Sequence, residues 1–182
     1  MPRVKSRGQV FVLVVLVASL FLNSSIASAD SYGAGPPNAG WIPDNHDHDW
    51  CWSTGWPGGS WVTDANARHV NLENQTLFGG GSNQTCSSGT DVYWKAVSIS
   101  ARGTYVCDDL NGSICDNASV TINTNTAVLP SGGERRKTMC HELGHSGGLS
   151  HYSGTALDCM VSGSSTLISY RAHAVGHLDA LA

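Results

Sequence analysis

The sequence predicts an α/β fold, because short runs with strand-like composition lie between longer runs with helical patterning. Two runs carry the strand signal. Residues 91–100 are rich in β-branched and aromatic side chains, and residues 119–124 alternate apolar and polar side chains. The helical signal includes His141 and His145, whose spacing places both on one helix face. Together these patterns favour a sheet packed against helices.

The expected elements follow in order along the chain. Thr63 or Asp64 can cap a first helix that continues to about Phe78, and the three glycines at 79–81 end it. The later elements are strands over residues 91–100, 104–107 and 119–124, a helix that begins at Glu134, and a final helix over residues 166–181. Residues 30–45 are rich in Gly, Pro, Ser and Asn and predict an irregular N-terminal arm.

Residues 1–29 have the organisation of a secretory signal peptide. A basic start precedes an apolar run over residues 10–22, which is too short to span a bilayer comfortably. Small residues at positions 27 and 29 then form a cleavage site, so the mature chain is expected to begin at Asp30. Residues 30–182 are predicted to form a single secreted domain.

The mature chain is acidic. Removing residues 1–29 takes away Arg3, Lys5 and Arg7 but no carboxylate, so the formal charge changes from −4 to −7. A chain with that charge is a poor candidate for nucleic-acid binding. The sequence contains no second apolar run, so we do not expect the mature form to associate with a membrane. We expect the mature protein to be extracellular, and we expect a monomer.

One stretch, beginning at His141, reads His-Glu-Leu-Gly-His-Ser-Gly-Gly-Leu-Ser-His and predicts a metal site. Because positions i and i+4 lie on one helix face, His141 and His145 can direct their imidazoles at one ion. Gly148 can adopt positive φ and turn the chain so that His151 becomes a third ligand. Three protein ligands with one open position are the arrangement of a catalytic zinc. Glu142, which directly follows His141, is expected to lie close to the open coordination position of the metal.

This stretch resembles the extended zinc signature of the metzincin zinc peptidases, His-Glu-x-x-His-x-x-Gly-x-x-His. That family also has a methionine-containing turn beneath the metal, and Met160, after Ala-Leu-Asp-Cys, follows at a suitable distance. The Gly-Leu-Ser-His run ending at His151 is most similar to the matrixin branch. The resemblance implies a metzincin-like α/β fold: a twisted mixed sheet with an active-site helix and a C-terminal helix, and a cleft between upper and lower parts.

The resemblance also implies a function, that of a secreted zinc-dependent endopeptidase acting on protein or peptide substrates. One catalytic zinc ion, held by His141, His145 and His151, is expected to activate a water molecule and to polarise the scissile carbonyl. Glu142 is expected to take the proton of that water as general base and to pass it to the leaving amine as general acid. Met160 is expected to pack beneath the metal without binding it.

Six cysteines, all in the predicted mature part, indicate three disulfides, which fifteen different pairings could satisfy. The favoured pairs are Cys140–Cys159, Cys107–Cys115 and Cys51–Cys86. The first would join the metal helix to the methionine turn, two elements that the zinc site already brings together. The second would close a short loop containing Asp and Gly, and the third joins the remaining two cysteines. A thiolate zinc site is the weaker alternative, because no Cys-x-x-Cys pair occurs.

Two further metal sites are open alternatives. Calcium prefers oxygen ligands, and one short segment offers four of them at Asp108, Asp109, Asn111 and Asp116, although their spacing matches no complete calcium loop. His46 and His48 share one face of an extended segment and offer ligands for a second metal ion. A solvated or hydrogen-bonded edge is the simpler interpretation of the two histidines.

An alternative function uses the tryptophans near the N-terminus, which lie among glycines at positions 41, 50, 52, 56 and 61. If these rings were exposed, the chain would be a secreted, non-catalytic, zinc-stabilised binding module, for example for glycans. Core packing is the usual fate of such rings. The presence of Glu142 and an open fourth metal position favours the peptidase.

Overall fold

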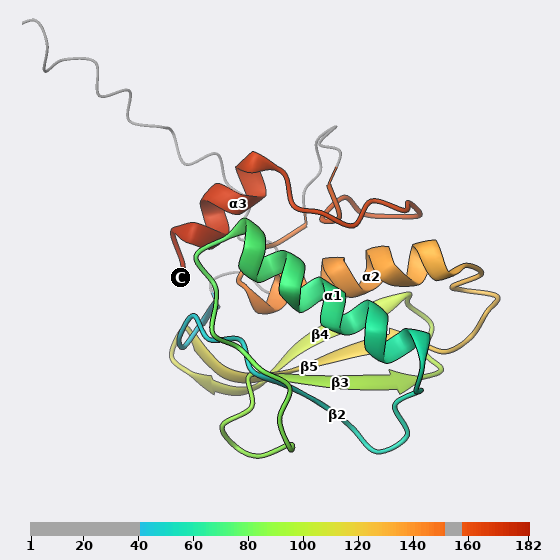
Figure 1. Ribbon diagram of the computed structural model, residues 1–182, viewed down its shortest axis with the longest axis horizontal. Coiled ribbons are helices and arrows are strands. Elements are labelled where there is room, and N and C mark those ends of the chain that lie inside the picture. Colours follow the sequence, from blue (N-terminus) through green and yellow to red (C-terminus); the bar gives the residue numbers. More distant parts are fainter. Residues whose placement is uncertain (1–40, 152–157) are drawn as a thin grey trace, which may run out of the picture. The chain divides into compact units, whose positions relative to one another are not determined.

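The computed structural model describes residues 41–151 and 158–182, all within one compact unit that spans Ser31–Ala182. The predicted signal peptide and its cleavage site lie outside the described residues, as do residues 30–40 of the predicted arm and residues 152–157. The described part contains five strands and three helices, and this confirms the α/β class (Figure 1).

The sheet is built around its longest strand. Its strands are β1 (Ile42–Pro43), β2 (Trp50–Trp52), β3 (Val92–Val97), β4 (Gly103–Asn111) and β5 (Ile114–Asn123). Strand β5 pairs in parallel with β1 and β3, β3 pairs in parallel with β2, and β4 pairs with β5 in the antiparallel direction. Strand β4 therefore lies at one edge of the described sheet.

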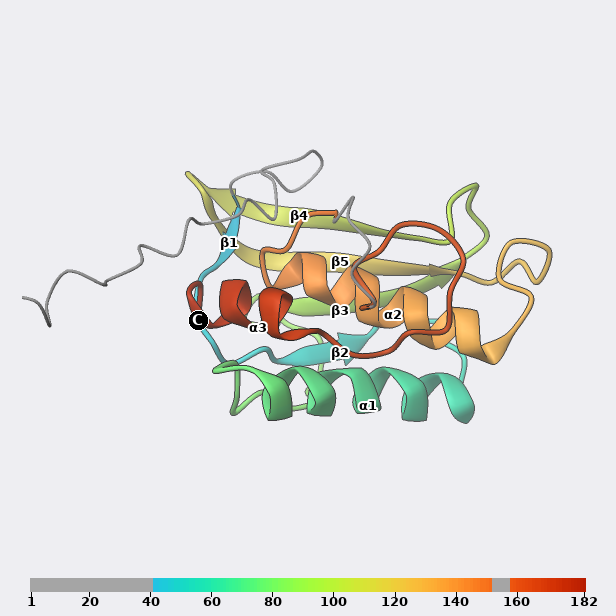
Figure 2. The same cartoon turned by 90° about the horizontal axis from the view of Figure 1, so that it is seen from above.

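The helices are α1 (Ser60–Gln75), α2 (Gly132–Ser146) and α3 (Ala172–Asp179). Helices α1 and α2 lie side by side over the same face of the sheet, and α3 lies farther from the sheet (Figures 1 and 2). The alternation of β3 buries Val92 and Trp94 completely toward these helices, while Tyr93 and Lys95 face the other way. Met139 and Leu143 of α2 are also fully buried and complete the core between helix and sheet.

Some predicted element bounds are wrong, each for a tertiary or local reason. The first helix ends at Gln75 rather than near Phe78, because the backbone of Thr76 is extended. The N–H and the hydroxyl of Thr76 both donate hydrogen bonds to the carbonyl oxygen of Leu72. The final helix begins only at Ala172. The chain before it is extended and bonded to α1: Arg68 donates to the carbonyl of Ile168 at 2.8 Å, and Gln75 accepts from the N–H of Tyr170.

The predicted strands 104–107 and 119–124 are parts of one long hairpin, β4–β5, which turns at Gly112 with φ 66°. Most side chains near its tip are exposed on both faces, so no apolar alternation marks these residues as a strand. Strands β1 and β2 were not predicted, because two or three residues are too few to form a pattern. Part of the predicted irregular arm therefore belongs to the sheet.

All three predicted disulfides are confirmed. The Cα–Cα separations are 5.2 Å for Cys51–Cys86 and 5.9 Å for both Cys107–Cys115 and Cys140–Cys159. Cys107 and Cys115 join two paired strands rather than the ends of a loop. Disulfides are typical of oxidising compartments, which agrees with the predicted extracellular location. Among the described helices, none combines the length and the apolar character needed to cross a bilayer.

Replacing Cys140 and Cys159 together by alanine is expected to lower the free energy of unfolding by about 3 kcal/mol, because the unfolded chain regains the entropy of an open loop. Their sequence separation is 19. Urea unfolding of the metal-free protein measures this loss. The control is the Cys107/Cys115 double alanine variant, with a separation of 8 and an expected loss of roughly 2.5 kcal/mol. An unchanged midpoint in the first variant would contradict the prediction.

Candidate metal centre

The start of α2 is fixed by Ser131 at the N-cap position. Its hydroxyl accepts a hydrogen bond from the N–H of Glu134 at 3.2 Å and donates one to the carboxylate of Glu134 at 3.4 Å. The helix therefore begins at Gly132, two residues before the predicted start at Glu134. It then continues without interruption to Ser146, so His141 and His145 lie one turn apart on the same face.

The end of α2 turns sharply at Gly148, as the sequence predicts. Its φ is 91°, which glycine adopts without steric cost. A Cβ here would also lie 2.7 Å from Leu181. The N–H of Gly148 bonds to the carbonyl of His145, and the N–H of Leu149 bonds to that of Gly144. This turn buries Leu149 and returns the chain so that His151 lies beside the two helical histidines.

The three histidines converge. The ring centroids are 4.7 Å apart for His141 and His145, 5.0 Å for His141 and His151, and 4.8 Å for His145 and His151. One ligand nitrogen from each ring lies within 4.8 Å of the other two. Within the described ranges, this is the one group of three or more His, Cys, Asp or Glu side chains arranged to hold a metal ion.

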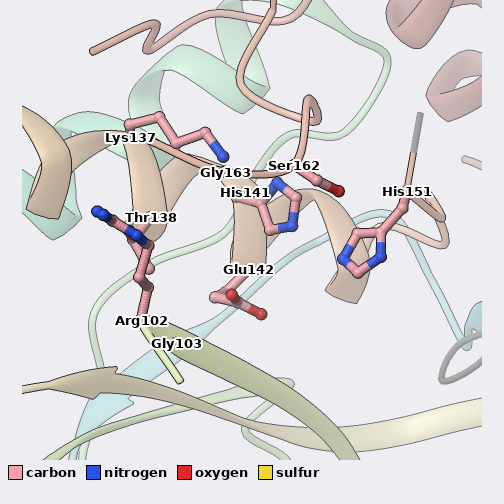
Figure 3. Close-up of a pocket in the computed structure, with 9 residues that line it drawn as sticks. All are labelled: Arg102, Gly103, Lys137, Thr138, His141, Glu142, His151, Ser162 and Gly163. Atoms are coloured by element: carbon pink, nitrogen blue, oxygen red, sulfur yellow. The ribbon is translucent and has the colours of Figure 1, made fainter. Parts of the chain in front are cut away.

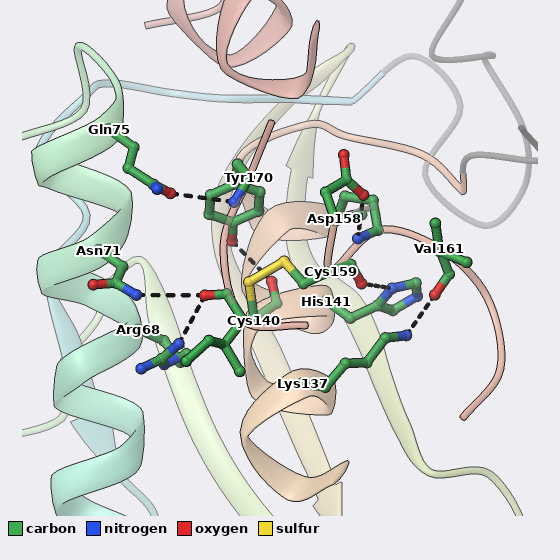
Figure 4. The surroundings of a disulfide bond; sticks show 12 residues. Arg68, Asn71, Gln75, Lys137, Cys140, His141, Asp158, Cys159, Val161 and Tyr170 are labelled. Atoms are coloured by element: carbon green, nitrogen blue, oxygen red, sulfur yellow. Dashed lines mark hydrogen bonds between the residues drawn. A yellow bond between two sulfur atoms is a disulfide. The ribbon is translucent and has the colours of Figure 1, made fainter. Parts of the chain in front are cut away.

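Hydrogen bonds orient the two buried rings. The Nδ1 atom of His141 lies 2.8 Å from the carbonyl oxygen of Cys159, and that of His145 lies 2.6 Å from the carbonyl oxygen of Leu149 (Figure 4 shows the former). Because a carbonyl oxygen only accepts, each Nδ1 carries the hydrogen and each Nε2 keeps its lone pair. This support is typical of metal-bound histidines.

The protonation of the three rings also suits a metal. Burial lowers the pKa of His141 to about 2 and that of His145 to about 4, and it lowers the pKa of His151 as well. The rings are therefore neutral at physiological pH, the form that zinc binds. A tetrahedral zinc with bonds of about 2.1 Å would hold the nitrogens roughly 3.4 Å apart. His151 is the exposed ring of the three, and the ligand nitrogens lie within 4.8 Å of one another.

Met160 lies directly against α2 between the two helical histidines. It is completely buried, and a Cβ added at Gly144 would lie only 2.4 Å from its sulfur. Glycine at position 144 therefore allows this close approach. The backbone around Met160 is held by the side chain of Asp158, which accepts from the Met160 N–H, and by the Cys140–Cys159 bond. The Ala156-Leu157 part of the predicted turn lies outside the described residues.

A cavity of about 210 Å³ opens beside the histidines, and Glu142 lines it together with His141 and His151 (Figure 3). Burial raises the pKa of Glu142 to about 8, and the positive charge of Lys137 opposes that rise. A divalent cation among the histidines would lower the pKa further. Glu142 thus has the placement and the tunable protonation of a proton-transfer group.

Sequence reasoning missed Gly103, at the start of β4. A Cβ here would lie 2.7 Å from Thr138 and 2.8 Å from Glu142, so only glycine lets the edge strand approach α2 this closely. A single glycine before a strand has no special signal in the sequence. Its role becomes evident only from the contact with Thr138 and Glu142, which lie more than thirty residues later in the chain.

The other predicted metal ligands do not come together in the described structure. His46 is exposed, whereas His48 is buried, with its ring 4.9 Å from that of Phe78. The oxygen-rich segment Asp108, Asp109, Asn111 and Asp116 is spread along the β4–β5 hairpin, and its carboxylates form no metal-type group in the described ranges. Asp116 instead contacts Asp44.

The early tryptophans pack against one another and the core. Trp50 is buried and stacks on His69 at a centroid distance of 3.9 Å. Trp52 stacks on Trp56 at 5.3 Å, and Trp56 meets the edge of Trp61 at 5.5 Å. Trp41 is partly buried against the same core. These contacts agree with the core-packing interpretation rather than with a platform of exposed rings.

No family model matches the chain, and no curated protein matches it. The site itself consists of three neutral imidazoles that converge and one buried carboxyl group that lines the adjoining cavity.

Replacing His145 by alanine is expected to reduce bound zinc from about one ion per chain to a small fraction at equal free zinc, because two ligands remain where three converge. Elemental analysis after equilibrium dialysis measures the stoichiometry. The matched control is His177→Ala, which removes a histidine from α3 and should leave the zinc content unchanged. Equal zinc content in wild-type protein and His145→Ala would contradict the assignment.

The buried His48 predicts a loss of stability in acid. Burial lowers its pKa from 6.5 to about 4, although a hydrogen bond to the backbone of Ser146 opposes this. Between those pH values the unfolded chain binds more protons, so the free energy of unfolding falls as pH decreases from 6.5, by roughly 3 kcal/mol at pH 4 from this group.

The variant His48→Gln is expected to remove the contribution of His48 alone, since glutamine does not titrate and its amide can still donate to Ser146. The buried His69, His141 and His145, whose pKa values burial also lowers, contribute to the pH dependence in both chains. Urea unfolding from pH 7 to pH 4, carried out on metal-free protein, compares the two chains. Curves of unfolding free energy against pH that run parallel for wild type and variant would refute the prediction.

Proposed function

We propose that this chain is a secreted zinc-dependent endopeptidase of the metzincin type. The observation that carries the proposal is the convergence of His141, His145 and His151 beside a cavity lined by Glu142. The match of the same residues to the metzincin signature supports it. The order of the elements also supports it: a mixed sheet, a metal helix across one face and a C-terminal helix.

The donor set favours a catalytic rather than a purely structural metal. Three histidines leave one position of a tetrahedral zinc open, and two of the three ligand residues also line the cavity. A zinc ion bound there would supply Lewis acidity, which polarises a carbonyl group and makes a water molecule a nucleophile near neutral pH. The rest of the chemistry is the work of the chain's own side chains.

Glu142 would move the proton. Its carboxylate would accept a proton from the attacking water and then, as the carboxylic acid, donate it to the leaving amine. Its burial keeps bulk water from competing, and its contact with Gly103 places it beside the edge strand β4. An extended substrate could add to this edge by main-chain hydrogen bonds, which would hold the scissile bond near Glu142. In this proposal the substrate cleft that the metzincin resemblance implies lies between β4 and the segment that follows Met160.

Replacing Glu142 by glutamine is expected to leave zinc content unchanged and to lower turnover of casein by about 10⁴, since the amide keeps the size of the side chain but cannot accept the proton. Zinc analysis and a casein assay on the same preparations measure both. In wild-type protein a chelator should abolish cleavage and added zinc should restore it. Near wild-type turnover by a zinc-loaded Glu142→Gln protein would refute the role.

A further inference from the structure

A second charged side chain, that of Lys137, lines the cavity that the candidate catalytic group also lines. Lys137 precedes His141 by one turn of α2 and lines the same cavity as Glu142 (Figure 3). The residue is only 4% exposed, and its ammonium donates to the carbonyl oxygen of Val161 at 2.5 Å (Figure 4). Burial of a lysine is costly unless its charge is compensated. Its presence in this cavity therefore needs an explanation.

The surrounding groups leave the charge of Lys137 incompletely compensated. Its hydrogen-bond partner is a neutral carbonyl, and no carboxylate of the described residues forms an ion pair with it. The second cation of the cavity, Arg102, differs in this respect, because Glu134 binds it at 2.9 Å. Burial lowers the pKa of Lys137, the charges of Glu142 and Asp158 oppose this from farther away, and the charge of Arg102 adds to it. One wall of the cavity is thus cationic next to the proposed reaction centre.

We propose that this cavity binds a carboxylate group of the substrate adjacent to the scissile bond, with Lys137 as the residue that determines the preference. The inference rests on the peptidase proposed above and makes its substrates acidic peptides. A volume of about 210 Å³ suits one side chain or a chain end. The carboxylate belongs either to an Asp or Glu side chain or to the C-terminus of a peptide.

Local charge is what would select this substrate. The predicted mature chain carries a formal charge of −7, so long-range attraction does not favour acidic peptides. Inside a partly enclosed site, however, a charge interaction is stronger than in bulk water. A neutral substrate of the same shape would bury the Lys137 ammonium without compensating its positive charge. A site that leaves a buried charge unpaired discriminates against such a substrate. Ser162 also lines the cavity and offers a hydroxyl donor, whereas the hydroxyl of Thr138 already donates to the carbonyl of Glu134 at 2.9 Å.

The test compares kcat/KM for peptides that differ in one carboxylate. In two arms, Glu is exchanged for Gln directly before or directly after the scissile bond. In a third arm, a peptide ending shortly after that bond carries either a free C-terminal carboxylate or an amide. Wild-type protein is expected to favour the carboxylate at least tenfold in one arm, and that arm identifies the source. The preference should weaken as salt is added.

The variant Lys137→Met should reduce that ratio to about 1, whatever its effect on the absolute rates, and Lys137→Arg should retain the preference. The matched control is Lys95→Met, which removes a lysine on the opposite face of the sheet and should leave the ratio unchanged. A wild-type ratio near 1 in all three arms, or an unaltered ratio in Lys137→Met, would overturn the inference while leaving the peptidase proposal intact.

A binding measurement separates the two proposals. Fluorescence anisotropy on zinc-loaded Glu142→Gln protein, which should not cleave, gives Kd for the Glu and Gln peptides. At least tenfold tighter binding of the Glu peptide, lost when Lys137→Met is added, supports the carboxylate site even if wild-type protein cleaves no peptide. A wild-type protein that cleaves no peptide would refute the peptidase proposal alone. Equal Kd values would refute the carboxylate site.

Discussion

Two buried hydrogen bonds, from the imidazoles of His141 and His145 to main-chain carbonyls, are the constraint on which the candidate centre depends. Much of the surrounding structure serves to supply those two acceptors. The carbonyl of Leu149 is in place because Gly148 adopts positive φ. The carbonyl of Cys159 is in place because the disulfide to Cys140 joins its segment to α2 and its N–H bonds to Ser169. Without these acceptors the rings would lack a fixed tautomer and orientation.

The candidate ligands could be predicted from sequence because the determinants of their geometry are local. Helical periodicity alone brings His141 and His145 together, and one glycine suffices to return His151. Gly103 and Lys137 could not be assigned in the same way. The significance of Gly103 comes from contact with a helix that follows it after the whole β4–β5 hairpin, and that of Lys137 from the cavity it lines. Such contacts are properties of the tertiary fold.

The same distinction between local and tertiary determinants explains which parts of the fold were predicted correctly and which were not. The α/β class follows from the strand composition of residues 91–100 and the alternation of residues 119–124, and the helix that carries the histidines follows from the spacing of His141 and His145. The hairpin tip around Gly112 lacks periodicity because solvent covers both faces. The segment before α3 has helical patterning, yet it is extended because Arg68 and Gln75 of α1 bond to its backbone. Tertiary hydrogen bonds there override a weak local preference.

The position of Lys137 on α2 also explains why one helix carries most of the candidate chemistry. Burial is the main cause of the lowered pKa of His141, His145 and His151 and of the raised pKa of Glu142, and the charge of Lys137 adds to the first effect and opposes the second. A single cation thus favours the neutral form of the three ligands and the ionised form of the proposed base, which are the forms that metal binding and proton transfer require. Methionine at this position would remove all of these effects together. Of these couplings, the attraction to the Glu142 carboxylate is the one that offsets part of the cost of burying the lysine.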